Sequence, residues 1–286
     1  MIKGVGGNYY ILSDEGERIT CAMKGSIRLG GLKPTVGDRV IFSDKGQMGR
    51  VVTKILPRKN HILRPSAANV SLSMAVFAVK APELDYCLLD MLLADNIIKG
   101  VVSALAVTKC DLADEGELEY IRENYSGALK DIFFISSDNR TGLKELREAL
   151  KGKITLLRGI SGAGKSSLIN ALCPEADRQT GELSERLKRG KNTTRVSELI
   201  PMDNNSFILD TPGFSDFHLK GVASEDLWKY YPEFYEYSHC KYANCLHIKE
   251  PECAVKEAAE GGKISYLRYS NYITIYEKMK KAPKEY

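Results

Sequence analysis

Short apolar runs that end in small or charged residues recur through the middle of the chain, and they predict buried strands of a parallel sheet. The clearest runs span residues 101–107, 132–136, 153–158 and 206–210. Helices are expected within residues 142–152 and from residue 166 to 172. A longer helical pattern with a basic end covers residues 254 to about 281. This alternation predicts a central α/β domain followed by a mostly helical C-terminal domain.

The first 64 residues have a different pattern, with short Val- and Ile-rich runs, glycine-rich turns and no long helical period. This pattern predicts a small all-β barrel of the OB type. The segment is also the basic one: it carries 12 Lys and Arg against 5 Asp and Glu, whereas residues 65–220 carry 19 against 22 and residues 221–286 carry 10 of each. A basic barrel would bind an RNA backbone through counterion release, although a solvated basic face has the same composition.

The chain as a whole has 286 residues, of which 43% are hydrophobic, and this is enough for more than one globular domain. No apolar stretch approaches the roughly 18 residues that a membrane helix needs. The N-terminus lacks the apolar run of a signal peptide. Seven cysteines without a regular framework fit a reducing compartment. We therefore expect a cytoplasmic protein with no membrane span.

A phosphate-binding loop is predicted where the sequence matches G-x-x-x-x-G-K-[ST] between an expected strand and an expected helix. Its glycines would let successive backbone N–H groups point at one anion, above the positive end of the helix. Lys165 is expected to reach the β- and γ-phosphates, and the Ser166 hydroxyl to bind Mg²⁺. The candidate residues are Gly159, Ile160, Ser161, Gly162, Ala163, Gly164, Lys165, Ser166 and Ser167.

A guanine-reading pattern, [NT]-K-x-D, follows the expected strand 101–107. It consists of Thr108, Lys109, Cys110 and Asp111. The Asp111 carboxylate can accept hydrogen bonds from guanine N1–H and the exocyclic amine, which adenine cannot offer. The Lys109 stem would lie over the base. Ser136 and Ser137 follow the next expected strand and resemble the element whose backbone N–H contacts guanine O6.

Two switch elements are expected after the phosphate loop. Strand 206–210 ends in D-x-P-G, where Asp210 would hold Mg²⁺, directly or through water, and the Gly213 N–H would sense the γ-phosphate. Thr193 or Thr194, in a polar stretch upstream, is the candidate second Mg²⁺ ligand. The base-reading pattern thus precedes the phosphate loop, so the parts of a GTPase occur in rotated order. A parallel sheet tolerates such a permutation because a site depends on spatial placement.

Three cysteines and one histidine near the C-terminal end predict a structural zinc site. The candidate ligands are Cys240, Cys245, His247 and Cys253. Four soft or borderline ligands suit tetrahedral Zn²⁺ with no open position. Glu250 and Glu252 are expected in solvent or behind the ligands, and the other four cysteines in the core or in loops. Buried free cysteines beside an unrelated histidine are the alternative.

These motifs resemble the ribosome small-subunit-dependent, circularly permuted GTPases of the RsgA (YjeQ/YloQ) family. The similarity extends to residues 36–40, 55–60 and 64–65. It implies an OB-fold over residues 1–64, a permuted GTPase domain over residues 65–220 and a zinc-binding domain over residues 221–286. It also implies binding of GTP and GDP with Mg²⁺, and GTP hydrolysis stimulated by the small (30S) ribosomal subunit during its late maturation. Contact with 16S rRNA and a monomeric state are expected.

At two positions, the residue differs from the one expected to orient the attacking water in a GTPase. Phe214 follows D-x-P-G where many small GTPases have glutamine, and Asn192 occupies the position where the family resemblance implies histidine. Asparagine can hydrogen-bond water but cannot act as a base near neutral pH. Five cations between residues 186 and 195 lead to the hypothesis that the small subunit orders this stretch and supplies the missing stabilisation. A solvated charged loop is the alternative.

Two other functions stay open on the sequence. The chain could be an RNA-binding scaffold in which hydrolysis is incidental, as Phe214 and Asn192 suggest, although the intact Asp210 and phosphate loop oppose this. It could also be an ATP-using P-loop enzyme, which Asp111 argues against. The connectivity further predicts that the switch after Asp210 leads to the zinc domain, whereas the base-reading half is joined to the basic barrel.

Overall fold

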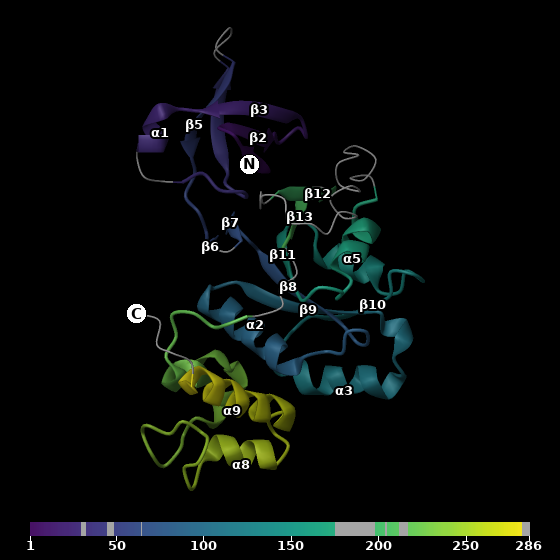
Figure 1. Cartoon of the computed structure of the whole chain (residues 1–286), viewed down its shortest axis with the longest axis vertical. Coiled ribbons are helices and arrows are strands. Elements are labelled where there is room, and N and C mark those ends of the chain that lie inside the picture. Colours follow the sequence, from purple (N-terminus) through teal and green to yellow (C-terminus); the bar gives the residue numbers. More distant parts are fainter. Residues whose placement is uncertain are drawn as a thin grey trace. The chain divides into compact units, whose positions relative to one another are not determined.

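The computed structural model describes residues 1–29, 33–44, 49–63, 65–174, 198–203, 205–211 and 217–281. Its contacts divide the chain into two compact units, and each unit is made of segments that are far apart in the sequence (Figure 1). The first unit consists of residues 1–73, 143–158 and 165–212. The second unit consists of residues 74–142, 159–164 and 213–286.

The first unit begins with a five-stranded sheet in the order β1-β2-β3-β5-β4. The strands are β1 (Lys3–Val5), β2 (Asn8–Leu12), β3 (Arg18–Met23), β4 (Val40–Asp44) and β5 (Arg50–Ile55), and the short helix α1 (Gly25–Leu29) follows β3. Burial alternates along β3, where Ile19, Cys21 and Met23 enter the core and their neighbours are exposed. The predicted all-β N-terminal part is confirmed.

The segment that follows this sheet, residues 56–63 and 65–68, packs closely against the turn at Gly37 and Asp38. It forms the hairpin of β6 (His61–Leu63) and β7 (Ser66–Ala68). Gly37 has a φ of +90°, and a Cβ there would lie 2.0 Å from the carbonyl oxygen of Ala68, so only glycine fits. Arg58 donates two hydrogen bonds to the buried carboxylate of Asp38, at 2.6 and 2.9 Å.

The first unit also contains three strands of α/β type. β11 (Ile154–Arg158) runs parallel to β13 (Ser206–Asp210), which pairs with the antiparallel strand β12 (Leu199–Asp203). The helices α4 (Leu143–Ala149) and α5 (Lys165–Leu172) belong to the same unit. The sequence pattern predicted every one of these elements except β12. Pro201 lies within that strand and cannot donate a backbone hydrogen bond, and the structure accommodates it because β12 is last in the strand order.

In the second unit, three strands lie in the order β10-β9-β8. They are β8 (Leu72–Ala78), which enters this unit at residue 74, β9 (Val102–Thr108) and β10 (Ile132–Ile135). The helices α2 (Tyr86–Ile98) and α3 (Glu115–Tyr125) share a hydrophobic core with these strands. Asp114 begins α3 with a capping box to Glu117. This cap and the end of β9 hold the loop that contains the base-reading pattern at both ends.

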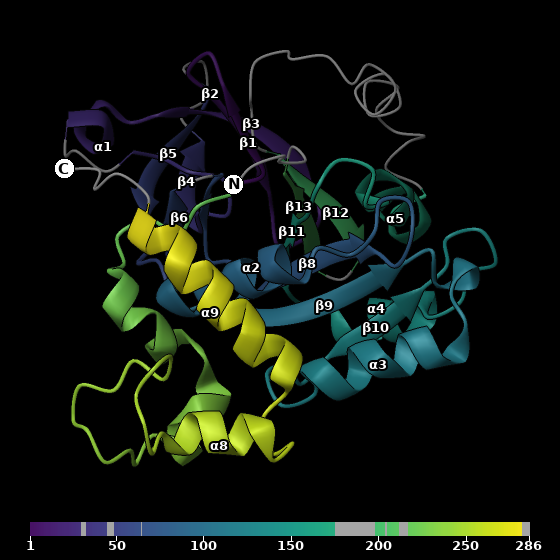
Figure 2. The same cartoon turned by 60° about the horizontal axis from the view of Figure 1, so that its bottom comes forward.

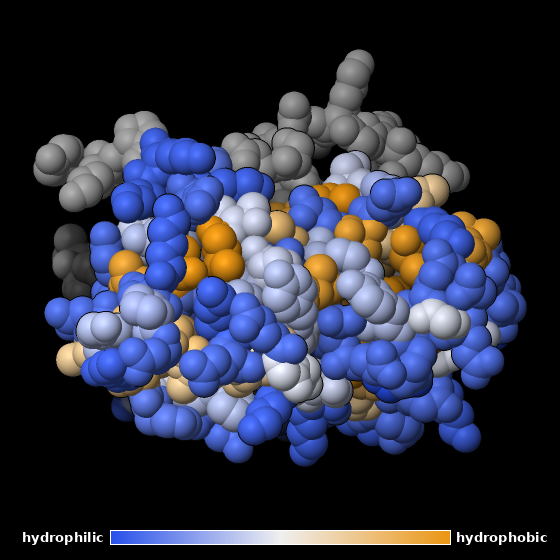
Figure 3. Space-filling view, turned by 90° about the horizontal axis from the view of Figure 1, so that it is seen from below, coloured by the Kyte–Doolittle hydropathy of each residue, from blue (hydrophilic) through white to orange (hydrophobic). Residues whose placement is uncertain are grey.

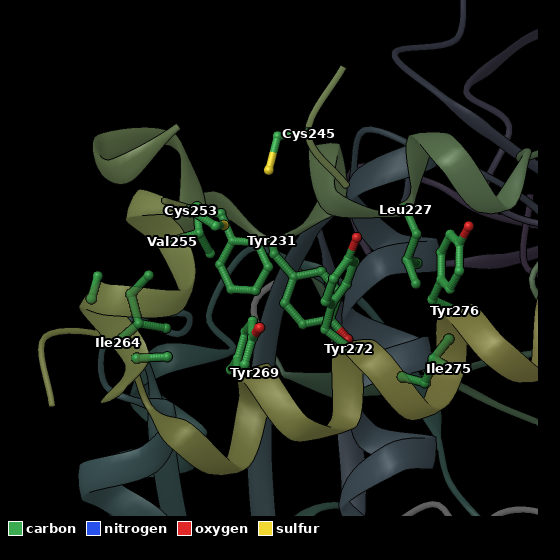
Figure 4. Close-up of a cluster of buried hydrophobic side chains, with 13 residues drawn as sticks. Leu227, Tyr231, Cys245, Cys253, Val255, Ile264, Tyr269, Tyr272, Ile275 and Tyr276 are labelled. Atoms are coloured by element: carbon green, nitrogen blue, oxygen red, sulfur yellow. The ribbon is translucent and has the colours of Figure 1, made fainter. Parts of the chain in front are cut away.

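The C-terminal module is helical, as predicted, and has an aromatic core (Figure 4). Its elements are the 3₁₀ helices η3 (Ser224–Tyr230) and η4 (Pro232–Tyr237) and the α-helices α8 (Ala254–Glu260) and α9 (Tyr266–Lys281). The rings of Tyr231, Phe234 and Tyr272 lie with their centroids 5.1 to 5.3 Å apart. Such contacts add to the hydrophobic stabilisation of a small module.

A buried ionic network attaches helix α9 to helix α2, and Figure 2 shows these two helices crossing. Arg268 is 2% exposed and donates to the carboxylates of Asp90 on α2 and Glu233 on η4. Asn271 donates a further hydrogen bond to Asp90 at 2.8 Å. Burial raises the pKa of Asp90 to about 6, and the positive charge of Arg268 limits the rise. Because an unpaired buried charge costs about 3–5 kcal/mol, the network holds the module firmly to α2.

The exterior is mainly polar on the face that Figure 3 shows, with hydrophobic side chains in smaller groups between hydrophilic ones. Within the described residues, no helix is both long enough and apolar enough to span a membrane.

Candidate nucleotide site and metal centre

The phosphate loop has the strand–loop–helix form that the sequence predicted, running from β11 into α5. Gly162 and Gly164 both have a φ of +81°, which glycine adopts without strain. Gly159 is required for another reason: a Cβ there would lie 2.1 Å from the carbonyl oxygen of Val76 in β8. Ser161 and Gly162 are exposed at the tip. The loop backbone is therefore accessible to a ligand while its first glycine is packed against a strand.

The base-reading residues are held directly against this loop. Thr108 is 3% exposed, and its hydroxyl donates a hydrogen bond to the carbonyl oxygen of Ala163 at 2.7 Å. A Cβ at Gly164 would lie 3.1 Å from the same hydroxyl oxygen. The Thr108 hydroxyl is thus used to position the phosphate loop, and recognition of a base falls to its neighbours.

Those neighbours form a tight turn after β9. Lys109 has a left-handed φ of 56°, and its ammonium donates to the carbonyl oxygen of Ala81. Cys110 is buried, whereas Asp111 is exposed on a short 3₁₀ turn and is accessible to a ligand. No sequence pattern identified Ala81 or Pro82, and the Cδ of Pro82 would lie 3.4 Å from a Cβ at Gly162. The loop after β8 therefore borders both motifs.

The second predicted base-contacting element lies after β10. Ser136 is fully buried, and its N–H donates to the carbonyl oxygen of Thr141 at 3.2 Å. This turn closes at Gly142, where a Cβ would lie 2.2 Å from the carbonyl oxygen of Phe134. Because the Ser136 N–H is engaged, the half-buried Ser137 is the better candidate for a bond to guanine O6.

Lys165 and Asp210 form the charged part of the candidate site in the first unit. Burial lowers the pKa of Lys165 and raises the pKa of Asp210, and each charge opposes the shift of the other. Asp210 Oδ1 is buried and has no hydrogen-bond partner among the described residues. The Thr211 hydroxyl donates to the carbonyl oxygen of Leu157 at 2.7 Å, which fixes the end of β13.

An unpaired buried carboxylate oxygen is costly, and a cation relieves the cost. Asp210 and the exposed Ser166 hydroxyl at the start of α5 are oxygen donors of the type that Mg²⁺ prefers, so these residues fit the predicted ion. Several predicted residues lie outside the described part of the chain, and their roles stay predictions. They are Asn192, Thr193, Thr194, Gly213, Phe214 and the cations between residues 186 and 195.

The four candidate zinc ligands converge in the C-terminal module. Their ligand atoms all lie within 4.8 Å of one another. Cys240 Sγ is 3.8 Å from Cys253 Sγ, and His247 Nδ1 is 3.4 Å from each of these sulfurs. Tetrahedral Zn²⁺ with Zn–S bonds of about 2.3 Å separates two sulfurs by about 3.8 Å. The donor set and its spacing therefore fit a closed, four-coordinate metal site with Cys245 as the remaining ligand.

The surroundings hold the ligands in place. The Glu250 carboxylate accepts backbone N–H bonds from Leu246, Ile248 and Lys249 at 2.9, 3.0 and 3.1 Å, so it shapes the ligand loop from behind. Burial raises the pKa of Cys245 to about 12. Metal binding must therefore displace thiol protons. The His247 ring meets Trp228 edge-on, with centroids 5.3 Å apart.

The other four cysteines behave as expected. None of the seven forms a disulfide. Cys21, Cys110 and Cys173 are buried, and Cys87 is partly buried with its thiol donating to Asn271 Oδ1 at 3.3 Å.

Two family models match the chain. A model for the RsgA GTPase covers residues 55–220, and a model for the RsgA N-terminal domain covers residues 1–51. A relative from Agathobacter rectalis is 38% identical over 99% of this chain and 98% of its own length. A relative from Clostridium perfringens is 41% identical over 98% of this chain and 96% of its own length. Both are named Small ribosomal subunit biogenesis GTPase RsgA.

Two solved structures resemble the whole chain. YjeQ from Thermotoga maritima matches with a TM-score of 0.83 and 33% identity, over 99% of this chain and 98% of that one. YloQ, described as a circularly permuted GTPase, matches with a TM-score of 0.80 and 30% identity, over 100% of this chain and 95% of that one. The permuted order of motifs is thus shared with a solved relative. The chain belongs to the RsgA GTPase family.

Proposed function

We propose that this chain binds and hydrolyses GTP and acts in the biogenesis of the small ribosomal subunit. One observation carries the proposal: Thr108 bonds the phosphate loop at Ala163, and this contact brings the base-reading pattern beside the phosphate-binding loop. The full-length relatives, 38% and 41% identical, support the ribosomal part because both are named for it.

Phosphate binding would rest on the backbone N–H groups of residues 159–167 and on the Lys165 ammonium. The positive end of α5 would add to the attraction. Ser166, Asp210 and either Thr193 or Thr194 would hold Mg²⁺, which when bound neutralises charge that develops on the γ-phosphoryl oxygens. Gly213 would donate its N–H to the γ-phosphate. Asp210 Oδ1 supports this assignment, because it is buried and has no partner within the part of the chain that the structure describes.

The attacking water would be positioned with help from outside the chain. Asn192 would orient water by hydrogen bonding, but neither it nor Phe214 can remove a proton. Phosphoryl transfer depends mainly on positioning and charge stabilisation. The cations between residues 186 and 195 would be attracted to 16S rRNA, so binding of the small subunit would supply the missing order.

The remaining parts would serve RNA binding and stability. Residues 1–64 would form the RNA-binding OB-fold, residues 65–220 the GTPase domain and residues 221–286 the zinc-binding domain, with one structural Zn²⁺ on Cys240, Cys245, His247 and Cys253. The end of the GTPase family model at residue 220 supports the second boundary, whereas the two models meet at residues 51–55, about ten residues before the proposed first boundary. The protein would act as a monomer in the cytoplasm, where ribosomal subunits are assembled.

Turnover of GTP should be slow for the chain alone and faster with small subunits, because the subunit supplies stabilisation that Asn192 and Phe214 do not. We expect stimulation of roughly 10²-fold or more, the size of one preorganised electrostatic contribution. Phosphate release would be measured with small subunits, large subunits and neither. Equal turnover in all three would contradict the proposal and favour a scaffold in which hydrolysis is incidental.

Replacement Asp111→Asn should lower affinity for GTP and raise affinity for xanthosine triphosphate, whose C2 carbonyl accepts from an amide N–H where guanine presents an amine. The mismatch leaves polar groups unpaired, so a loss of roughly 10²-fold is expected. Fluorescent analogues of GTP, xanthosine triphosphate and ATP would measure binding. Asp114→Asn, at a helix N-cap where Asn serves equally well, is the control. GTP binding unchanged by Asp111→Asn, or ATP bound as well as GTP, would refute the base-reading role.

Removal of zinc should loosen the C-terminal module. Trp228 is the single tryptophan, and its ring lies against His247, so its emission reports on the site directly. We expect one Zn²⁺ per chain by elemental analysis and a red shift of Trp228 emission when a chelator removes it. Cys253→Ser should abolish both metal and shift, whereas Cys87→Ser, outside the cluster, should retain both. A wild-type chain without stoichiometric metal would exclude the site.

A further inference from the structure

The first strand of the barrel is bonded to a strand of the α/β part of the same unit. The Leu199 N–H donates to the carbonyl oxygen of Ile2 at 2.9 Å, and Lys3 and Glu198 form an antiparallel bridge. Lys3 Nζ lies 2.9 Å from Glu198 Oε2, and the two side chains are only 18% and 21% exposed. This ion pair is more shielded from water than the exposed pair of Arg50 and Glu17, at 38% and 62%. It is therefore screened less by salt.

Leu199, which donates this hydrogen bond to the barrel, belongs to β12, and β12 pairs with β13, the strand that ends in the candidate Mg²⁺ ligand Asp210. Leu199 and Ile200 in β12 pair with Leu209 and Ile208 in β13. Asp210 is the next residue of β13 after Leu209. A shift of β12 would therefore be transmitted by backbone hydrogen bonds to the residue beside Asp210, because paired strands resist slippage.

The barrel is also joined to the α/β strands of this unit by the hairpin that follows it. The Ala68 N–H in β7 donates to the carbonyl oxygen of Val36 in the barrel at 2.8 Å. Further along the chain, the Ser71 N–H donates to the carbonyl oxygen of Ile154 in β11 at 2.9 Å. The barrel is thus bonded directly beside β12, and it is linked to β11 through this hairpin.

We propose that the pair of Lys3 and Glu198, with the bond between Ile2 and Leu199, is a coupling contact between the barrel and the strand of Asp210. RNA bound to the barrel would act through this contact on the position of Asp210, and the nucleotide would act back on the barrel by the same free energy. Lys3 and Glu198 are positioning residues that touch neither nucleotide nor metal. The inference rests on the proposed GTP binding and deepens it.

The test has a first readout that needs no ribosome. Amide hydrogen exchange of residues 2–5 and 199–203 would be compared with GDP and with a non-hydrolysable GTP analogue, after nucleotide binding has been verified. In the wild type, exchange in both segments should depend on the nucleotide. Lys3→Met or Glu198→Gln should remove that dependence from residues 2–5, and the swap Lys3→Glu with Glu198→Lys should restore it. Glu17→Gln, at an exposed barrel pair, should change nothing.

The second readout is turnover at saturating small subunits. The single variants should reduce stimulated turnover by about fivefold, the low end of common coupling strengths, and leave basal turnover and the half-saturating subunit concentration unchanged. The swap should recover most of the loss. A raised half-saturating concentration that the swap does not repair would mean that Lys3 contacts RNA instead, and would overturn the coupling.

Failure of the two proposals is distinguishable. Nucleotide-independent exchange of residues 2–5 in a wild-type chain that binds nucleotide would overturn the coupling contact, whatever subunits do. Wild-type turnover that small subunits leave unchanged, with nucleotide-dependent exchange intact, would overturn the ribosomal function and leave the contact standing.

Discussion

The nucleotide site depends on backbone approaches that leave no room for a side chain. At Gly159 a Cβ would lie 2.1 Å from the carbonyl oxygen of Val76, and at Gly164 it would lie 3.1 Å from the Thr108 hydroxyl. Both partners belong to strands that precede the phosphate loop in the chain. The hydrogen bond from Thr108 to Ala163 adds a directional restraint. These contacts explain how a permuted chain keeps its base-reading and phosphate-binding parts together.

The barrel and the C-terminal module are neighbours of different parts of the GTPase domain in the fold than they are along the chain. By connectivity, the half with the predicted base-reading pattern follows the barrel, and the segment after Asp210 leads to the C-terminal module. In the structure, the strands and helices around Thr108 share a unit with the C-terminal module, which Arg268 ties to Asp90 on α2. The strand that ends in Asp210 shares a unit with the barrel. The predicted base-reading residues therefore share a unit with the C-terminal module, and the candidate Mg²⁺ ligand Asp210 shares a unit with the barrel.

The sequence predicted what is local and missed what joins distant segments. Strands 153–158 and 206–210, the loop between Gly159 and Ser167, and the cluster of Cys240, Cys245, His247 and Cys253 were recognisable because their spacing is typical of the structures they form. The pairs of Asp38 with Arg58 and of Lys3 with Glu198 were not, because nothing in either segment identifies its partner. β12 was missed since Pro201 breaks its pattern. The water-positioning role of residues 192–194 stays a prediction from sequence.

The proposed function requires that nucleotide state and binding to the small subunit are linked. Cosedimentation with purified subunits tests this most directly, because linkage requires the nucleotide to change subunit affinity by the same factor as the subunit changes nucleotide affinity. The chain should pellet with small subunits in a non-hydrolysable GTP analogue, much less in GDP, and not with large subunits in either. Equal pelleting in both nucleotides, or with both subunits, would mean that nucleotide state and small-subunit binding are not linked.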